Sequence, residues 1–198
     1  MGTPRAFQAE EILAREGEDH ASFWLILGGW VRLTAIADNG TVAFLHLQGP
    51  GDLIGELDGR LNTSTATAAQ RVSARRIHRS VLLQFLQQHP DATLSLAEAM
   101  VDMLRQANRR RLDTVAYPAT VRIARILVEL AETYGTEGQE IRPPLSQRDL
   151  ASLAGVTLPT VEKALRLLRE TGVVARGYRS VSINNMPALH DLAGYWSD

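Results

Sequence analysis

The spacing of apolar residues changes once along this chain, near residue 80, and this change limits the fold more than any other feature. Before it, short apolar runs such as 23–27 and 30–34 are separated by glycine-containing turns such as Gly28-Gly29. After it, apolar residues recur at the spacing of amphipathic helices. Strands gathered in one part of a chain and helices in another are typical of α+β proteins. The sequence therefore predicts an α+β fold with a strand-rich first part.

Turn signals divide the first part into short strands. The strand expected at 30–34 is followed by Asp38-Asn39-Gly40, and Asn-Gly is the strongest short hairpin signal. The return strand is expected at 41–47, a further strand at 53–57 and a last one at about 66–77. Short antiparallel strands at this spacing indicate a small barrel or sandwich.

Two helices are expected after the strands. Apolar residues between 81 and 86 predict a short helix that ends before His89-Pro90, because proline disfavours helical geometry in the residue before it. A long helix is expected over 91–116, and its apolar stripe consists of Leu96, Met100, Met103, Leu104 and Ala107. One small barrel cannot cover a helix of this length. The stripe therefore favours a dimer seam over packing on the chain's own barrel.

Composition excludes several classes of protein. The chain has 198 residues, 45% of them hydrophobic, which suffices for one or two domains of ~100 to 200 residues each. It has no cysteine, which excludes disulfides, thiolate zinc sites, cysteine-ligated iron–sulfur clusters and a thiol nucleophile. No stretch approaches the ~20 apolar residues of a membrane span, and the first residues lack the apolar core of a signal peptide. We expect a cytoplasmic protein.

The histidines form no pattern typical of a metal site or an enzyme. His46 with Glu56 invites comparison with metal-binding cupins, but the paired His-x-His of such sites is absent. A phosphate-binding Gly-Lys loop cannot be argued either, nor can a Ser/His/Asp order. We therefore expect that the protein is not an enzyme and that it holds no metal.

Charge is unevenly distributed although the net charge is only −1. Residues 1–59 carry 9 acidic and 3 basic residues, a charge of −6, whereas 60–111 carry 9 basic and 3 acidic residues, a charge of +6. A second basic stretch, 140–185, has a charge of +3 from 7 basic and 4 acidic residues. The cluster Arg109-Arg110-Arg111 is open to three interpretations: a solvated face, which is favoured, a salt-bridged hinge beside Asp113, or a part of effector signalling.

Tyr117-Pro118 ends the long helix and marks a domain boundary. An amphipathic helix is expected over 120–134, and a polar connection with Gly and Pro over 135–144. The segment 146–168 that follows has the order of a helix-turn-helix, which makes it the most informative part of the chain.

Each part of the segment 146–168 has a physical role. Ser146 with Asp149 three residues later nearly matches the capping box that begins a helix. Gly155 supplies the turn, and Thr157 is expected to cap a second helix, whose first turn tolerates Pro159. The buried positions are expected to be Leu150, Leu153 and Ala154 on the first helix and Val161, Ala164, Leu165 and Leu168 on the second. The residues left pointing outward are Leu158, Pro159, Glu162, Lys163 and Arg166.

The pattern of 172–183 predicts two strands around a glycine-centred turn that carries Arg176 and Arg179. Together with the preceding helices, these strands make a winged helix. A helix presented in this way fits the major groove of DNA, with its first turns against base edges and its amino end near phosphates. Any pair of helices can imitate the pattern, so a purely structural helix pair stays open. The arginines of the wing and the helix upstream favour DNA binding.

The whole chain resembles the Crp/Fnr superfamily of bacterial transcription regulators. Three motifs carry the resemblance: Gly28-Gly29-Trp30-Val31-Arg32-Leu33, Gly51-Asp52-Leu53-Ile54-Gly55-Glu56-Leu57, and the unit 146–168. The resemblance implies a cyclic-nucleotide-binding-type β-roll (jelly roll) over 1–90, a long dimerisation helix over 91–117 and a winged helix-turn-helix DNA-binding domain over 118–198. It also implies a homodimer that binds a palindromic operator in double-stranded DNA, with RNA polymerase as a partner.

The chain departs from the members that bind cyclic AMP at a triplet that contacts the effector. Members that bind cyclic AMP pair its phosphate with the arginine of an Arg-Ser/Thr-Ala triplet, and this chain has Ser64-Thr65-Ala66 there. Arg60 and Arg71 are the nearby substitutes. We therefore do not expect cyclic AMP acting in the usual way, and two alternatives stay open: another small effector, either a cyclic nucleotide or a different molecule, or no effector at all. No cofactor is assigned with certainty. The resemblance gives these candidate contacts: Gly55, Glu56, Leu57, Ser64, Thr65 and Asn108.

The same resemblance assigns the candidate DNA contacts. Members often begin the recognition helix with an Arg-Glu pair, whereas Leu158 and Pro159 stand here, so we expect a target different from the common family palindrome. Lys163 takes the place of a base-reading residue. Phosphate contacts fall at Ser146, Gln147, Arg148, Thr157, Thr160 and Arg179, and the neighbours Glu162, Arg166 and Arg176 complete the set. The alternative is a nucleotide-sensing module that acts on a protein partner and whose C-terminal domain does not bind DNA.

Overall fold

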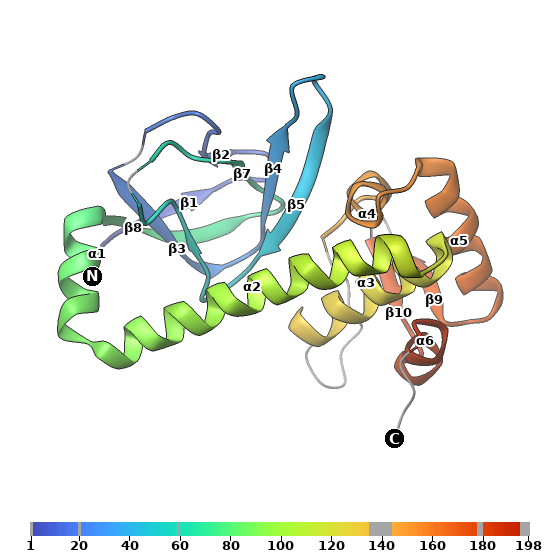
Figure 1. Ribbon diagram of the computed structural model, residues 1–198. Coiled ribbons are helices and arrows are strands. Elements are labelled where there is room, and N and C mark those ends of the chain that lie inside the picture. The colour runs from blue at the N-terminus through green and yellow to red at the C-terminus, as the bar shows by residue number, and fades with distance from the viewer. Residues whose placement is uncertain (1, 20, 59, 135–143, 178–179, 195–198) are drawn as a thin grey trace. The chain divides into compact units, whose positions relative to one another are not determined.

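The computed structural model describes residues 2–19, 21–58, 60–134, 144–177 and 180–194. The chain divides into two compact units, Met1–Arg105 and Gln106–Asp198, which we call the N-terminal and the C-terminal unit. Helix α2 (Pro90–Ala116) runs through this division (Figure 1). The expected α+β class is confirmed, with sheets in the N-terminal unit and mainly helices in the C-terminal unit.

The N-terminal unit contains two four-stranded antiparallel sheets. The first has the order β1 (Thr3–Phe7), β8 (Val72–His78), β3 (Ser22–Gly28), β6 (Leu53–Ile54). The second has the order β2 (Ile12–Ala14), β7 (Thr65–Ala68), β4 (Val31–Ile36), β5 (Val42–Gln48). Their apolar side chains form one core, in which the Phe7 and Trp24 rings meet edge to face with centroids 5.0 Å apart. The expected β-roll is present.

Glycine turns connect the strands as the sequence predicts, but one of them changes sheet. Asn39-Gly40 closes the antiparallel hairpin of β4 and β5, with φ +81° at Gly40. Gly29 instead carries the chain from β3 in the first sheet to β4 in the second. Its φ is +85°, and a Cβ there would lie 2.2 Å from the Arg71 carbonyl oxygen. Only glycine fits this close approach.

Two strand predictions were wrong. The single strand expected at 66–77 is two strands, β7 and β8, which belong to different sheets. The turn between them is held to the β3–β4 connection, since Ala69 N donates to Trp30 O at 2.8 Å. The strand expected at 53–57 ends at Ile54, where Gly55 takes a φ of +137°. Neither the change of sheet between β7 and β8 nor the end of β6 at Ile54 could be recognised from the spacing of apolar residues.

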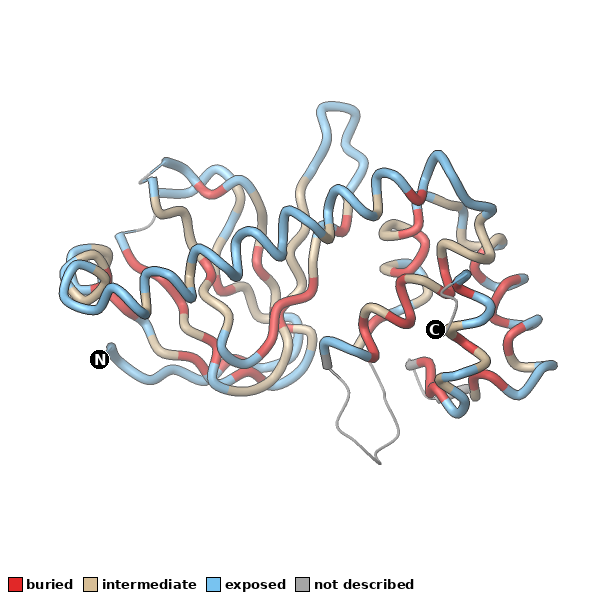
Figure 2. Tube along the Cα trace, turned by 60° about the horizontal axis from the view of Figure 1, so that its bottom comes forward, coloured by how far each residue is buried: buried red, intermediate tan, exposed pale blue. Residues whose placement is uncertain are grey.

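Helix α1 (Arg79–Gln88) covers the outer face of the first sheet, where Leu82 packs with Phe23 and Ile77. It ends before Pro90, as predicted. Helix α2 begins at Pro90 and has 27 residues, which confirms the long helix. Its predicted stripe is only half-covered at Leu96, and Met100, Met103 and Leu104 are 48%, 40% and 61% exposed. Figure 2 shows exposed residues along most of α2.

Among the described residues of the C-terminal unit, four helices and a two-stranded ribbon follow α2. Its elements after α2 are α3 (Ala119–Tyr134), α4 (Gln147–Ala154), α5 (Leu158–Glu170), β9 (Val174–Gly177), β10 (Ser180–Ile183) and α6 (Met186–Leu192). Helix α3 contacts α4, α5 and α6. It buries Ile123, Leu127 and Leu130, the three residues that the sequence placed on one side. The predicted connection over 135–143 lies outside the described residues.

Candidate nucleic-acid interface

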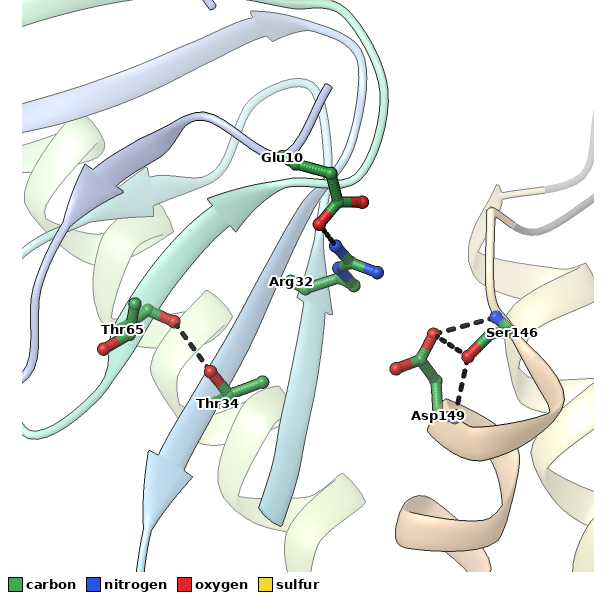
Figure 3. A network of polar contacts seen from close by, with 6 residues as sticks. All are labelled: Glu10, Arg32, Thr34, Thr65, Ser146 and Asp149. Carbon is green, nitrogen blue, oxygen red and sulfur yellow. Dashed lines mark hydrogen bonds and ion pairs between the residues drawn. The ribbon is translucent and has the colours of Figure 1, made fainter. Parts of the chain in front are cut away.

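The beginning of α4 is fixed by a complete capping box. The Ser146 hydroxyl accepts from Asp149 N at 3.2 Å, and Asp149 Oδ2 accepts from Ser146 N at 2.8 Å (Figure 3). The same carboxylate oxygen accepts from the Ser146 hydroxyl at 2.8 Å. Ser146 therefore uses its hydroxyl, both as donor and as acceptor, inside the protein. This predicted phosphate contact is better suited to positioning α4 than to binding DNA through its side chain.

The turn between α4 and α5 follows the prediction at Gly155. Gly155 adopts the left-handed conformation, with φ +58°, and Val156 N donates to Ala151 O at 3.0 Å. The buried face of α4 differs by one residue, because Ala151 is buried together with Leu150 and Ala154, whereas Leu153 is half-buried. Packing against α3 and α5 decides which of these neighbouring apolar positions is covered.

The beginning of α5 departs from the prediction in one bond. Thr157 occupies the N-cap position and Pro159 lies in the first turn, as predicted. The Thr157 side chain, however, makes no cap hydrogen bond, and its hydroxyl lies 2.9 Å from the hydroxyl of Thr160. The predicted side-chain cap is therefore wrong. The two hydroxyls expected near phosphates lie beside each other at the amino end of α5.

Helix α5 separates its residues into two faces. Val161, Ala164, Leu165 and Leu168 are buried, as predicted. Pro159, Glu162, Lys163 and Arg166 are exposed, at the i, i+3, i+4 and i+7 positions of one helix face. Leu158 and Thr160 are half-buried. The structure thus gathers four of the predicted contact residues on one open surface.

The polar groups on this open face have no partners inside the described part of the protein. Glu162, Lys163 and Arg166 form no side-chain hydrogen bond or ion pair with the described residues. A helix face that presents unpaired polar groups and rests on a packed core is suited to bind a polar surface such as the edge of a base pair. The sequence did not single out Leu167, which is 48% exposed beside this face.

The remaining predicted DNA contacts are less fully described. Arg148 is exposed on α4, and Gln147 is half-buried at the first position of that helix. Arg176 lies on β9, where its Cα pairs with that of Val181 on β10. Arg179 lies outside the described residues. The ribbon β9–β10 is antiparallel, as expected of a wing.

The end of α2 is joined to α3 by two ion pairs, whose partners on α3 the sequence did not predict. Arg110 pairs with Glu129, and Arg125 Nε lies 2.8 Å from Asp113 Oδ2. The side chains of Asp113 and Arg125 are only 9% and 11% exposed. Arg125 also donates to the carbonyl of Ala193, at the end of α6, at 3.0 Å. The solvated-face interpretation therefore fails for Arg110.

The spacing of the four charged residues along their helices was the one sequence signal that pointed to these ion pairs. Arg110 and Asp113 are three residues apart, and Arg125 and Glu129 are four apart, so each pair shares one face of its helix. Each of the two helices therefore carries one basic and one acidic residue, so each charge can find an opposite charge on the other helix. The sequence alone could not match Arg110 with Glu129 or Asp113 with Arg125, because it does not show that α2 and α3 bring these residues together. Arg109 and Arg111 are exposed.

The candidate effector residues are partly occupied by hydrogen bonds within the roll. Gly55, Glu56 and Leu57 are half-buried just after β6. Glu56 Oε1 accepts from the Thr63 hydroxyl at 2.7 Å. The Thr65 hydroxyl accepts from Glu16 N at 3.1 Å, and its carbonyl accepts from Thr34 Oγ1 at 3.5 Å (Figure 3).

The other candidate effector residues add no cation to this group. Ser64 is half-buried beside Thr65, and Asn108 is exposed on the part of α2 that belongs to the C-terminal unit. Arg60 is paired with Asp58 at 3.3 Å, with its side chain 84% exposed. Arg71 is exposed in the β7–β8 turn. In the part of the chain that the structure describes, neither of these two arginines forms a hydrogen bond or an ion pair with Glu56, Ser64 or Thr65.

Two further observations limit other kinds of site. No described helix combines the length and the apolar character that crossing a membrane requires. Within the described ranges, no three His, Asp or Glu side chains are grouped so that they could hold a metal ion.

Comparison with family models divides the chain in two. Residues 4–89 match the cyclic nucleotide-binding domain, and residues 121–192 match the Crp-like helix-turn-helix domain. The two matches leave out the whole of α2.

Known proteins resemble the chain over nearly its whole length. The CRP-like cAMP-activated global transcriptional regulator of Mycobacterium tuberculosis is 30% identical over 192 residues, which are 94% of this chain and 86% of that protein. The nitrogen fixation regulation protein FixK of Azorhizobium caulinodans is 25% identical and is covered over 79% of its length by 97% of this chain. The solved structure of FixK2 from Bradyrhizobium japonicum superposes with a TM-score of 0.85 at 26% identity, over 97% of both chains. The comparisons give no support to a module that acts only on a protein partner. With its nucleotide-binding-type roll, its winged helix-turn-helix and these relatives, the chain belongs to the Crp/Fnr family of DNA-binding transcription regulators.

Proposed function

We propose that this regulator is a homodimer that binds a palindromic operator by placing α5 of each protomer in the major groove. The observation that supports this most directly is the open face of α5, where Pro159, Glu162, Lys163 and Arg166 lie over a fully packed apolar face. In winged helices such a face reads base edges, and phosphate contacts around it set the register.

Within this interface, Lys163 is proposed to read bases. Leu158 and Pro159 offer only apolar contacts at the start of α5, for example to a thymine methyl group. A target that differs from the common family palindrome follows from this apolar start. The proposed phosphate contacts are Gln147, Arg148, Thr157, Thr160, Arg176 and Arg179, while Ser146 contributes through the capping box.

The partner in the dimer is proposed to be a second copy, paired along α2. Support comes from Met100, Met103 and Leu104, which a single chain leaves 40% to 61% exposed. Apolar side chains at helical spacing on a long helix are typical of a helix–helix seam. A two-fold axis along this seam would place two half-sites about 34 to 36 Å apart on DNA. We propose the domain limits 1–90, 91–117 and 118–198, and RNA polymerase as a further partner.

A small effector in the β-roll is proposed to control this dimer. Cyclic AMP does not fit the described residues well. The region of Glu56 and Thr65 contains Ser64 where cyclic-AMP-binding members carry arginine, and Arg60 is paired with Asp58. A cyclic phosphate would lack a charge-assisted partner, whose loss reduces affinity by roughly tenfold to a hundredfold.

The experiment that tests this function is selection of DNA from a random pool. The purified full chain is incubated with random duplexes at stated salt, without an effector, and the retained duplexes are sequenced. Enrichment of a palindrome that differs from the common family site is the expected result. Enrichment of the common family palindrome would contradict the proposed role of Leu158 and Pro159. No enrichment, with or without cyclic AMP, would contradict DNA binding by the chain alone.

A further inference from the structure

The N-terminal unit contains a cavity that the DNA-binding function does not explain. Its volume is about 220 Å³, and its walls come from both sheets and from the segments before β3 and before β7. Of the candidate effector residues discussed above, only Gly55 lines it. The charged and polar residues in its lining are Arg5, Glu18, Asp19, Ser22, Asn62 and Arg76.

Two of the lining residues, Arg5 and Arg76, are cationic, and both lie on strands of the first sheet. Arg76 lies opposite Trp24 in the β3–β8 register, and its guanidinium carbon is 6.0 Å from the centroid of the Trp24 ring. Arg5 lies 5.7 Å from the same ring. Arg5 pairs with Glu11 through one of its nitrogens, at 3.0 Å, whereas Arg76 forms no hydrogen bond or ion pair with the described residues. A guanidinium has five N–H donors, so donors are available to a carboxylate.

Two other lining residues, Glu18 and Asp19, are anionic, and hydrogen bonds to Asn62 hold the segment that carries them. Asn62 is buried, and its Nδ2 donates to Arg15 O at 3.0 Å. Its backbone accepts from Gly17 N at 2.8 Å and donates to Glu18 O at 3.1 Å. These three bonds fix the segment that carries Glu18 and Asp19. Asp19 is exposed and forms no ion pair with the residues described here.

Charges of both signs therefore line one small cavity without neutralising each other across it. Arg76 and Asp19 have no ion-pair partner in the described chain, and Glu18 reaches Arg15 only at 3.8 Å. A simple anion placed here would meet the two carboxylates, and a simple cation would meet the two guanidinium groups. A ligand that carries both charges offers a partner to the arginines and to the carboxylates alike.

We infer that this cavity binds a small zwitterion of the α-amino acid class, with its carboxylate on Arg76 and Arg5 and its ammonium group on Asp19 and Glu18. The size agrees, because about 220 Å³ is below the roughly 300 to 1,000 Å³ of sites for drug-sized ligands. The inference goes beyond the proposed function and does not depend on DNA binding.

Calorimetric titration of the purified full chain with each of the twenty standard amino acids tests the inference. We expect at least one of them to bind once per protomer at concentrations up to ~10 mM, a range that includes affinities of the order of millimolar. Its amide derivative lacks the carboxylate, and its decarboxylated amine keeps only the ammonium group. Each should bind at least about tenfold more weakly than the amino acid.

Two variants and two matched controls locate the site. Arg76→Gln and Asp19→Asn should each weaken binding at least about tenfold. Arg71→Gln and Asp38→Asn make the same charge changes in exposed turns outside the cavity and should leave binding unchanged. Unchanged thermal unfolding of all four variants establishes that they are folded, since the four side chains are exposed.

Several results would overturn the inference. The cavity is not a zwitterion site if none of the twenty amino acids binds, or if the amide binds as well as the acid. Binding that survives both Arg76→Gln and Asp19→Asn places the ligand elsewhere. Loss with Arg76→Gln alone would indicate an anion site instead. None of these results depends on the selection of DNA, so the two proposals fail separately.

Discussion

The candidate DNA contacts and the candidate effector contacts are presented in opposite ways. On α5, Lys163 and Arg166 project from one exposed face and have no partner among the described residues. In the roll, the Glu56 carboxylate and the Thr65 hydroxyl are hydrogen-bonded to their own chain. The face of α5 therefore offers polar groups that no described neighbour occupies, whereas a ligand at Glu56 and Thr65 meets groups that already form hydrogen bonds within the roll. The difference teaches that the candidate DNA contacts are presented to solvent, while the candidate effector contacts are built into the packing of the roll.

The largest change in the free energy of unfolding is expected from breaking the buried Asp113–Arg125 ion pair of the C-terminal unit. Asp113→Ala leaves the buried Arg125 guanidinium without its carboxylate, and loss of one partner of a buried pair costs about 3 to 5 kcal/mol. Denaturant unfolding measures this loss. Asp102→Ala breaks the exposed Asp102–Arg105 pair of the same helix and should cost no more than about 1 kcal/mol. Equal effects of the two substitutions would show that the buried pairs do not support the unit.

A second test breaks the packing beneath the open face of α5. Leu168 is fully buried, and Leu168→Ala should lower the free energy of unfolding by about 2 to 5 kcal/mol. Its neighbour Leu167 is 48% exposed, so Leu167→Ala should change the same quantity by about 0.5 kcal/mol or less. A comparable loss from both would mean that α5 does not have the two faces described.

A third test sharpens the distinction between base reading and phosphate binding within the C-terminal unit. Lys163→Ala should lower discrimination among DNA sequences by about 1 to 3 kcal/mol. Arg148→Ala should weaken binding to all sequences nearly equally and reduce the salt dependence. Filter or fluorescence binding to the selected operator and to random DNA, at several salt concentrations, measures both. If Arg148→Ala changes sequence preference and Lys163→Ala does not, the assigned roles are reversed.

The smallest effect concerns the pH dependence of the β-roll. Burial raises the pKa of the Asp52 carboxyl above its usual range, and the hydrogen bond from Gly49 N opposes this shift. Because the folded state binds this proton more tightly than the unfolded state, Asp52 contributes stability below the unfolded pKa of 3.8. That contribution is lost as the pH rises through the folded pKa. The free energy of unfolding of the original chain should therefore fall slightly between acid and neutral pH because of Asp52. In Asp52→Asn this small fall should be absent.

Glu11 provides the opposite control for the pH test. The Gln8 backbone N–H and the Arg5 side chain lower the pKa of the Glu11 carboxyl. Its contribution is present above the unfolded pKa of 4.5 and is lost as the pH falls through the folded pKa. Glu11→Gln should thus change the pH profile of unfolding in the direction opposite to Asp52→Asn. Changes of the same sign in both variants would contradict these assignments.

Short-range patterns predicted much of the C-terminal unit. The capping box of Ser146 and Asp149, the left-handed Gly155 and the buried face of α5 all depend on residues within a few positions of one another. The prediction failed at Thr157, whose hydroxyl lies beside the Thr160 hydroxyl and makes no cap hydrogen bond to the backbone. Sequence order cannot decide between these two kinds of partner, because the choice depends on the side-chain rotamer that the fold sets.

Long-range pairing limited the prediction of the N-terminal unit. The hairpin at Asn39-Gly40 is local and was predicted, but the segment 66–77 divides between two sheets, because each half has different partners far along the chain. The cavity lined by Arg5, Asp19 and Arg76 has the same origin, since it brings together β1, the segment before β3, and β8. No local pattern indicates these neighbours.

The sequence by itself determined the order of roll, long helix and winged helix, the absence of cysteine chemistry, and the outward face of α5, because turns, caps and helical spacing act over a few residues. Only the tertiary structure decided which distant charges meet. It pairs Asp113 with Arg125 and Arg110 with Glu129, yet leaves Arg76 without a partner among the described residues. The physical reason is that the energy of an ion depends on burial and on neighbours from other elements, which the linear order of residues does not contain.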